Sequence, residues 1–249
     1  MPEVSVIIPT YNVEAFILET VNSVFEQSFA NWEILIIDDC STDLTAKILK
    51  DNFSLNPKVR LFLNNENRGS GFCRNLGIAE ASGRYIAFLD SDDVWYKEKL
   101  SLQLEFMKRH NSPISHTAYG FFDSKGGRLP GRIRVSNQVG LLDNLKRTEI
   151  GTSTAIIDTN MVGADFRFSD IRARQDLVLW VDLMSLGFYS NGMDLELVKY
   201  RVRGGSVSSN KLKMLWVTLR VYLRFKKLPL YQRVYCYFLY VFNAIRKRV

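Results

Sequence analysis

Hydrophobic runs alternate with amphipathic segments through the first half of the chain. Near-continuous apolar runs, typical of strands buried on both faces of a parallel sheet, cover residues 4–9, 32–39, 59–63 and 85–89. Segments with apolar residues at helical spacing cover residues 13–27, about 42–52 and 72–81. Asn12 is predicted to cap the first helix, and Ser41 or Thr42 the second. The alternation predicts an α/β fold with an open, mostly parallel sheet and helices on both faces.

The second half is less regular but continues the same mixture. Helices are expected at residues 97–109 and 174–186, and strands at 113–122, 151–158 and 193–206, the last ending in a basic, glycine-rich loop. A turn is predicted at "DSKGG" (123–127). We expect one α/β domain over residues 1–208.

Polar clusters follow three of the predicted strands. They are Thr10-Tyr11-Asn12, Asp38-Asp39 and Asp90 to Asp93. Open α/β sheets bind ligands beyond the carboxyl ends of their strands, so these clusters predict one crevice. The acids at positions 90, 92 and 93 repel one another, and a positively charged partner or full solvation is expected there.

Composition narrows the class of protein. Hydrophobic residues make up 47% of the 249 residues, which is ordinary for a globular domain. Cys40, Cys73 and Cys236 form no CxxC pair, so neither a disulfide scaffold nor a zinc site is expected, and a reducing compartment is indicated. The first residues enter a strand at once, and we expect no signal peptide.

Charge is distributed unevenly. The net charge is +7, but residues 197–249 contain 13 Lys and Arg and no acid. A basic tail can indicate nucleic-acid binding, but this one is rich in apolar residues, so no nucleic-acid partner is expected.

Four segments carry a resemblance to a known family. "VSVIIPTYN", "WEILIIDDCSTD", "NRGSGFCRNLGIAEASGRYIAFLDSDD" and "YRVRGGSVS" resemble, in order and spacing, the inverting glycosyltransferases of family 2. The resemblance covers about residues 3–208 and implies the GT-A fold. It also implies transfer of a sugar from a nucleotide donor, usually UDP-linked, of the kind used for bacterial O-antigen and surface polysaccharide.

The resemblance gives the "DSD" turn a role at a divalent metal. It implies that Asp92 is the direct ligand of Mg²⁺ or Mn²⁺, and that Asp90 reaches the ribose, the metal or a metal-bound water. One or two carboxylates with diphosphate oxygens suffice for such an ion. The alternative is a solvated acidic turn that caps a helix after Val94.

Donor contacts are implied at four further positions. Tyr11 and Asp39 match the family's nucleobase contacts, with Pro9 beside them at the end of the first strand. Arg74 matches an arginine that approaches the base. The alternatives are a helix cap for Asp39 and an ordinary surface arginine for Arg74.

The family places its catalytic base at the start of a late helix, and Asp176 matches that position. Asp176 would take the proton from the acceptor hydroxyl as it attacks the anomeric carbon. Gln175 stands where the family often has Glu. Asp170 and Asp182 are the alternatives considered for this role.

Two arginines match the family's "YR-x-H" segment, in which Arg203 replaces histidine. Arg201 or Arg203 is expected to hold the leaving diphosphate, because a guanidinium can bind it bidentately. The alternative is a solvated basic strand end.

Residues 209–249 predict two amphipathic helices divided at Pro229. Their longest uncharged run, residues 234–245, is too short to span a membrane, so helices lying in the membrane interface are expected. The alternative is a helical pair packed on the domain or on a dimer partner.

The interpretation is a peripheral enzyme at the cytoplasmic face of the inner membrane. The resemblance implies transfer of a hexose, glucose as the first choice, from a UDP-sugar to a lipid-linked acceptor such as GlcNAc-diphospho-undecaprenol, forming a β linkage. UDP-Gal, UDP-GlcNAc or UDP-GalNAc are alternative donors. A Mg²⁺-binding receiver domain, a nucleotidyltransferase and a lectin-like binder are the alternatives from other classes.

Overall fold

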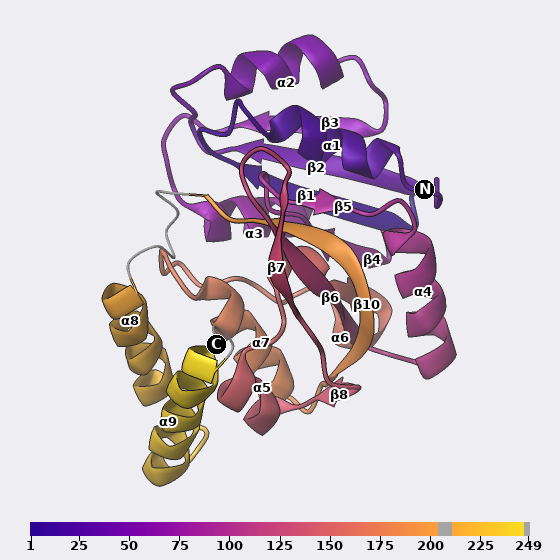
Figure 1. The fold of residues 1–249 in the computed structure, drawn as a ribbon. Coiled ribbons are helices and arrows are strands. Elements are labelled where there is room, and N and C mark those ends of the chain that lie inside the picture. Colours follow the sequence, from indigo (N-terminus) through magenta and orange to yellow (C-terminus); the bar gives the residue numbers. More distant parts are fainter. Residues whose placement is uncertain (204–210, 247–249) are drawn as a thin grey trace.

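The computed structural model describes residues 1–203 and 211–246, and a single large sheet runs through it (Figure 1). The strands follow the order β3-β2-β1-β4-β9-β6-β10-β5. The first four in the chain are parallel neighbours: β1 Val4–Thr10, β2 Trp32–Asp38, β3 Val59–Leu63 and β4 Tyr85–Phe88. The predicted α/β sheet is confirmed, and all four strands end at one edge.

The second half adds mixed pairing to this sheet. β6 (Ile114–Phe122) and β10 (Ser190–Arg201) are parallel to each other, and β9 (Ile156–Asp158) runs antiparallel between β4 and β6. The short strands β5 (Val94–Trp95), β7 (Arg128–Ile133) and β8 (Gln138–Val139) pair antiparallel at the periphery. The acidic turn after β4 therefore leads into a strand, and the next helix begins only at Lys99.

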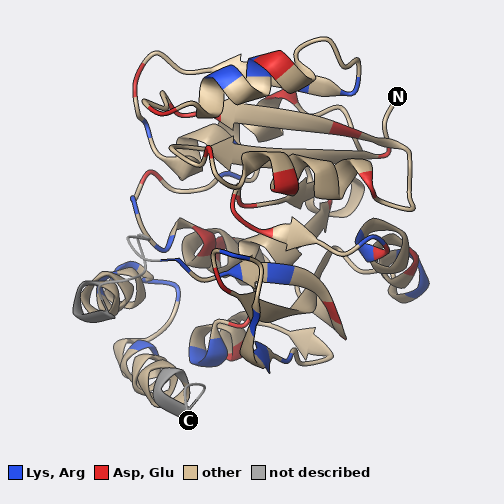
Figure 2. Cartoon of the chain, turned by 45° about the horizontal axis from the view of Figure 1, so that its top comes forward, with Lys and Arg blue, Asp and Glu red and all other residues tan. Residues whose placement is uncertain are grey.

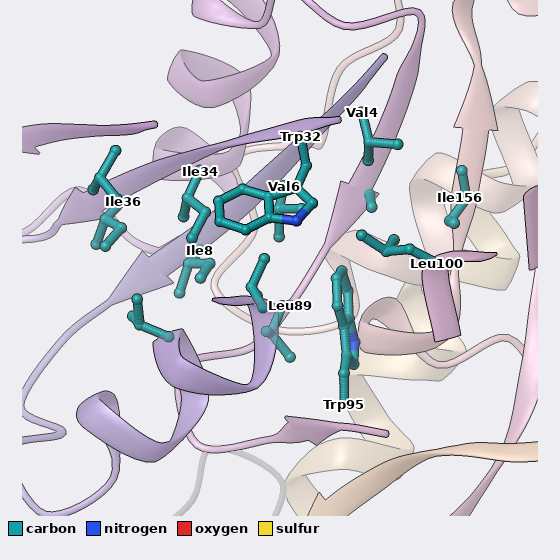
Figure 3. Close-up of a cluster of buried hydrophobic side chains, with 14 of the residues drawn as sticks. Val4, Val6, Ile8, Trp32, Ile34, Ile36, Leu89, Trp95, Leu100 and Ile156 are labelled. Carbon is teal, nitrogen blue, oxygen red and sulfur yellow. The ribbon is translucent and has the colours of Figure 1, made fainter. Parts of the chain in front are cut away.

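Helices cover both faces because strand residues alternate between them. Val6 and its alternate neighbours face α1 (Ile17–Phe25), α2 (Thr45–Phe53) and α4 (Lys99–His110), as Figure 3 shows for the packing around Trp32 and Trp95. Ile7 faces the opposite side, towards α3 (Ser70–Glu80) and α7 (Gln175–Ser185). The shorter α5 (Leu141–Arg147), α6 (Thr159–Val162) and the 3₁₀ turn Thr152–Thr154 lie between these elements in the chain.

The predicted helix caps are wrong. Asn12 has a left-handed backbone (φ 50°), and its Oδ1 accepts a hydrogen bond from the backbone N–H of Thr42 at 2.8 Å. It therefore ties the end of β1 to the loop after β2, while α1 begins only at Ile17. Likewise α2 begins at Thr45, whose backbone N–H donates to Asp43 Oδ1 at 2.9 Å. Residues 152–154 form a 3₁₀ turn where a continuous strand was predicted.

Two C-terminal helices pack against the domain. They are α8 (Lys211–Arg224) and α9 (Leu230–Arg246), and they lie beside α5 and α7. Buried side chains from all four helices form one apolar cluster: Leu145, Leu177, Val181, Tyr222, Cys236 and Tyr240. Arg174, just before α7, donates from Nε to Thr218 Oγ1 at 2.9 Å and contacts the Tyr240 hydroxyl.

This packing agrees with the alternative of a helical pair seated on the domain. The predicted domain boundary at 208/209 and the glycine-rich loop lie outside the described residues. Among the residues that are described, no helix combines the length and the apolar character that a membrane crossing requires.

Candidate active site

A cavity of about 1300 Å³ opens at the carboxyl edge of the sheet. It is bounded by the ends of β1, β2 and β4, by α3 and α7, and by one face of α8. All the predicted site residues except Arg201 line it: Pro9, Tyr11, Asp39, Arg74, Asp90, Asp92, Asp176 and Arg203. Residues separated by up to 194 positions in the chain therefore meet in one place.

Asp39 organises one wall of the cavity. Its buried carboxylate accepts hydrogen bonds from the backbone N–H groups of Arg68 (2.9 Å) and Gly69 (2.7 Å) and from Asn64 Nδ2 (3.1 Å). Gly69 has φ 92° and directly precedes α3, so the carboxylate fixes the loop that enters this helix. Asp39 does not cap the helix after β2. Tyr11, in contrast, is half exposed at the same wall.

Arg74 is a buried ion-pair partner, and its interpretation as a surface residue is wrong. Only 5% of Arg74 is exposed, and its Nη2 lies 2.5 Å from Asp90 Oδ1. The guanidinium also lies 5.1 Å from the ring centre of Phe168. Arg74 thus supplies one of the positive charges that the acidic turn requires.

The three acids of the turn have different surroundings. Asp93 is fully buried and accepts hydrogen bonds from Ser153 Oγ (2.6 Å) and from the backbone N–H of Arg201 (2.9 Å). Burial, and then the charges of Asp90 and Asp92, hold the pKa of Asp93 well above its usual range. Asp93 is therefore structural, whereas Asp90 and Asp92 face the cavity. Burial and the charge of Asp90 also raise the pKa of Asp92, against the opposing effect of Arg203.

Arg203 and Arg201 occupy different environments. Arg203 lines the cavity, with Nε 2.6 Å from Asp92 Oδ2. Arg201 is only 6% exposed; its Nε donates to the carbonyl oxygen of Asp92 at 2.7 Å, and its Nη2 pairs with Glu19. Arg201 thus supports the acidic turn from outside the cavity, and it is not a solvated strand end.

Asp176 lies in the first turn of α7 and faces the cavity. The helix begins there because Arg174 turns the chain with φ 64° and Gln175 is held through its side chain by Ser70 of α3. Asp182 lines the cavity about two turns further along α7. Asp170 is exposed and does not line it. Asp176 is therefore the carboxylate of α7 that lies in the first turn of the helix and faces the cavity.

The acidic turn fits a divalent cation that is shared with a phosphate ligand. Asp90 and Asp92 offer hard carboxylate oxygens at the cavity edge, the ligand type that Mg²⁺ and Mn²⁺ prefer. No set of three or more His, Cys, Asp or Glu side chains in residues 1–203 and 211–246 is placed to hold a metal by itself. Ligands from a bound diphosphate would complete the coordination.

The sequence interpretation missed the contribution of α8. Five residues of this helix and the residue directly after it line the cavity: Met214, Val217, Arg220, Val221, Arg224 and Phe225. Their spacing of three and four residues places them on one helical face, a signal that is visible in the sequence. Only the position of α8 in the folded structure, set by its bond to Arg174 and by the apolar cluster it shares with α5, α7 and α9, shows that this face points into the cavity. Ser153 and Glu19, which support Asp93 and Arg201, were missed as well.

Comparisons with known proteins give the family. The family model described as "Glycosyl transferase family 2" matches residues 5–168. The chain belongs to glycosyl transferase family 2. This confirms the predicted family, and the enzyme is a glycosyltransferase and not a receiver domain, nucleotidyltransferase or lectin-like binder.

Relatives of this glycosyltransferase are named for teichuronic acid biosynthesis or for transfer to a lipid-linked sugar. It is 40% identical to the putative teichuronic acid biosynthesis glycosyltransferase TuaG of Bacillus subtilis, over 100% of this chain and 98% of TuaG. It is 35% identical to the Escherichia coli enzyme WfaP, a UDP-Glc:alpha-D-GlcNAc-diphosphoundecaprenol beta-1,3-glucosyltransferase, over 99% of this chain and 96% of WfaP. WfgD of Escherichia coli, named for the same reaction, is 32% identical over 98% of this chain and 94% of WfgD.

Solved structures confirm the GT-A fold. Staphylococcus aureus TarS in complex with UDP superposes with a TM-score of 0.69 and 24% identity, over 90% of this chain and 66% of that one. The Pyrobaculum calidifontis mannosyltransferase PcManGT, solved with GDP-Man and Mn²⁺, gives a TM-score of 0.70 and 15% identity, over 92% of this chain and 65% of that one.

Proposed function

We propose that this glycosyltransferase moves a hexose, with glucose as the preferred sugar, from UDP to a lipid-linked acceptor such as GlcNAc-diphospho-undecaprenol. The product is a β linkage within an O-antigen or related surface polysaccharide. The observation that carries the proposal is the meeting of Asp90, Asp92 and Asp176 in one cavity. The names of WfaP and WfgD support this donor and acceptor, and their sequences match nearly the whole chain.

The donor lies in this proposal along the edge of β1, β2 and β4. Tyr11, beside Pro9, offers an aromatic face to uracil. Asp39 accepts a hydrogen bond from the uracil N3–H, using oxygen lone pairs that the loop amides leave available. Arg74 holds Asp90 in place beneath the ribose. Bound Mg²⁺ or Mn²⁺, held by Asp92 with Asp90, would neutralise the diphosphate and stabilise it as a leaving group.

Arg203 is the proposed cation for the leaving diphosphate. In the structure, Arg203 pairs with Asp92. When a donor is present, the guanidinium exchanges this carboxylate for phosphate oxygens, with which it can form bidentate hydrogen bonds. Arg201 does not take this role, because its guanidinium is held outside the cavity by Glu19 and by the backbone of Asp92.

Asp176 is the proposed general base. It takes the proton of the acceptor hydroxyl while that oxygen forms a bond to the anomeric carbon and the bond to the diphosphate breaks. Attack from the face opposite the leaving group inverts the α-linked donor to a β-linked product. No covalent bond between sugar and enzyme is needed in this mechanism.

The C-terminal helices are proposed to rest on the cytoplasmic surface of the inner membrane. Their outer faces carry aromatic and aliphatic side chains that are 43–70% exposed: Trp216, Leu223, Leu230, Tyr231, Tyr235, Phe238 and Phe242. Figure 2 shows Lys and Arg but no Asp or Glu on the described parts of α8 and α9. Exposed aromatics with basic residues suit helices that lie in the interface of an anionic bilayer.

The decisive experiment is a matrix of donors and acceptors. Purified enzyme with Mn²⁺ or Mg²⁺ is incubated with UDP-Glc, UDP-Gal, UDP-GlcNAc or UDP-GalNAc and with GlcNAc-diphosphate on an alkyl chain. Products are identified by mass spectrometry. Transfer from UDP-Glc above the other donors supports the proposal, and absence of transfer from every UDP-sugar overturns it.

A further inference from the structure

We propose that Arg220 and Arg224 of α8 bind the diphosphate of the lipid-linked acceptor, an inference that rests on the proposed function. The pair is separate from Arg203, which we assign to the diphosphate of the donor. The reaction involves two diphosphates, and this assignment gives each of them its own cationic partner.

The cavity that holds Asp176 is also lined by α7 and α8. Its apolar lining includes Val178 and Val181 of α7, Val217 and Val221 of α8, and Phe225 directly after α8. Both arginines line this same cavity. The bond between Arg174 and Thr218 holds α8 against α7, so the walls are fixed relative to Asp176.

Among residues 1–203 and 211–246, the two guanidinium groups have no carboxylate partner. No acidic residue follows Glu196 in the sequence, and within the described residues neither Arg220 nor Arg224 forms an ion pair. By contrast, Arg74 and Arg201, which support the acidic turn, each contact a carboxylate. Like charges four residues apart on a helix destabilise it, so an anion is expected to bind between them.

The spacing of the pair suits a diphosphate. Side chains at positions i and i+4 project from one helical face, with about 5–6 Å between their Cβ atoms. Two long side chains that start from neighbouring positions on one face can reach the same diphosphate, and each guanidinium fork can take one phosphate group bidentately. Arg220 also lies 5.3 Å over the ring of Trp216, which limits the directions in which it can point.

The kinds of chemical group that line the cavity match those of the acceptor. A sugar hydroxyl belongs beside Asp176, the diphosphate beside the arginines, and the alkyl chain along the apolar residues of α8. The chain would then leave the cavity next to the exposed Trp216 and Leu223, the face proposed to lie in the membrane. A phospholipid headgroup carries the same phosphate chemistry, and the experiment separates these two sources.

The test compares two acceptors with the same sugar and alkyl chain, one with the diphosphate and one with a direct glycosidic link. The variants are R220Q/R224Q, the charge-conserving R220K/R224K, and the control K47Q/K50Q, which removes two exposed charges from α2. Initial rates are measured in detergent, and melting temperatures check the fold.

For R220Q/R224Q we expect the KM of the diphosphate acceptor to rise about tenfold or more. A rise of this size corresponds to the loss of roughly one charge-assisted hydrogen bond or more. The KM values of UDP-sugar and of the neutral acceptor should not change. For R220K/R224K the KM of the diphosphate acceptor should rise less, because the charge is kept and only the bidentate guanidinium geometry is lost. The control should match the wild type. An unchanged KM for the diphosphate acceptor, or an equal rise for both acceptors, overturns the assignment.

A binding measurement distinguishes failure of this assignment from failure of the proposed function. Calorimetric titration of the enzyme with GlcNAc-diphospho-undecyl needs no turnover. Binding that weakens in R220Q/R224Q supports the site even if no UDP-sugar is transferred, a result that would overturn the proposed reaction alone. If the variant instead loses only its sedimentation with phosphatidylglycerol vesicles and binds the acceptor normally, the arginines belong to the headgroups and the assignment fails.

Discussion

Arg203 contacts Asp92 at the edge of the cavity, with 2.6 Å between Nε of the guanidinium and Oδ2 of the carboxylate. Arg201, two residues earlier, contacts the same aspartate only through its carbonyl oxygen. Arg203 therefore offsets the charge of Asp92 inside the cavity, and Arg201 supports the backbone of the acidic turn from outside the cavity. This difference separates two roles that their shared sequence motif does not distinguish.

Replacing each arginine should separate these roles. R203A should weaken UDP-sugar binding and turnover by about tenfold or more, because a charge-assisted contact to phosphate is lost. The melting temperature should change little. R201A should lower the free energy of unfolding by about 2 kcal/mol, because it removes hydrogen bonds of a buried charged group. Calorimetric UDP titration and thermal melts check both. UDP-sugar binding by R203A at wild-type strength would contradict the role of Arg203.

Metal removal should abolish transfer. Of the three acids in residues 90–93, Asp90 and Asp92 face the cavity, and Asp93 is buried away from it. D92A should therefore lose activity and metal-dependent UDP binding while keeping its fold. EDTA should do the same to the wild type, and Mn²⁺ or Mg²⁺ should restore it. Full activity of D92A, or of wild type in EDTA, is incompatible with this assignment.

Asp176→Asn should reduce kcat by about 10²–10⁴-fold, the usual contribution of a general base. The KM for the donor should stay near the wild-type value, since donor contacts lie on β1, β2 and β4. D170N is the matched control, because Asp170 precedes the same helix but is exposed outside the cavity. Loss of activity in D182N together with normal activity in D176N would move the base to Asp182.

The aromatic face of α9 should control membrane binding. Tyr235, Phe238 and Phe242 are 55–66% exposed, and the triple serine variant Y235S/F238S/F242S should lose most of its sedimentation with anionic vesicles. L44S/L55S removes exposed apolar side chains from the other end of the molecule and should bind as wild type does. Salt should weaken binding of the wild type, because the basic residues are screened. A wild-type protein that stays in the supernatant at low salt would show that the helices only pack on the domain.

The first half of the fold followed from local pattern. Near-continuous apolar runs fixed β1 to β4, and the polar residues after them marked the cavity edge, so Asp39, Asp90 and Asp92 were found where predicted. The error at Asn12 has a long-range cause: its amide bonds to Thr42, thirty residues away, instead of to the helix that follows it. A cap motif in sequence cannot show that a competing partner exists.

The rest of the site depended on packing that no local signal reveals. The motif could not tell Arg201 from Arg203, because the partners of Arg201 come from Glu19 and from the acidic turn. The α8 face was visible as a periodic pattern, but its position against α7 comes from Arg174 and Thr218. Buried Asp93 resembled a third site acid until Ser153 and the Arg201 backbone were seen to satisfy it.

The most direct test of the central claim is the anomeric configuration of the product. Wild-type enzyme is incubated with UDP-α-glucose, a divalent cation and GlcNAc-diphospho-undecyl, and the new linkage is read from the anomeric proton coupling in the NMR spectrum. A single displacement assisted by Asp176 predicts a β-linked disaccharide on the lipid. An α-linked product would contradict the mechanism.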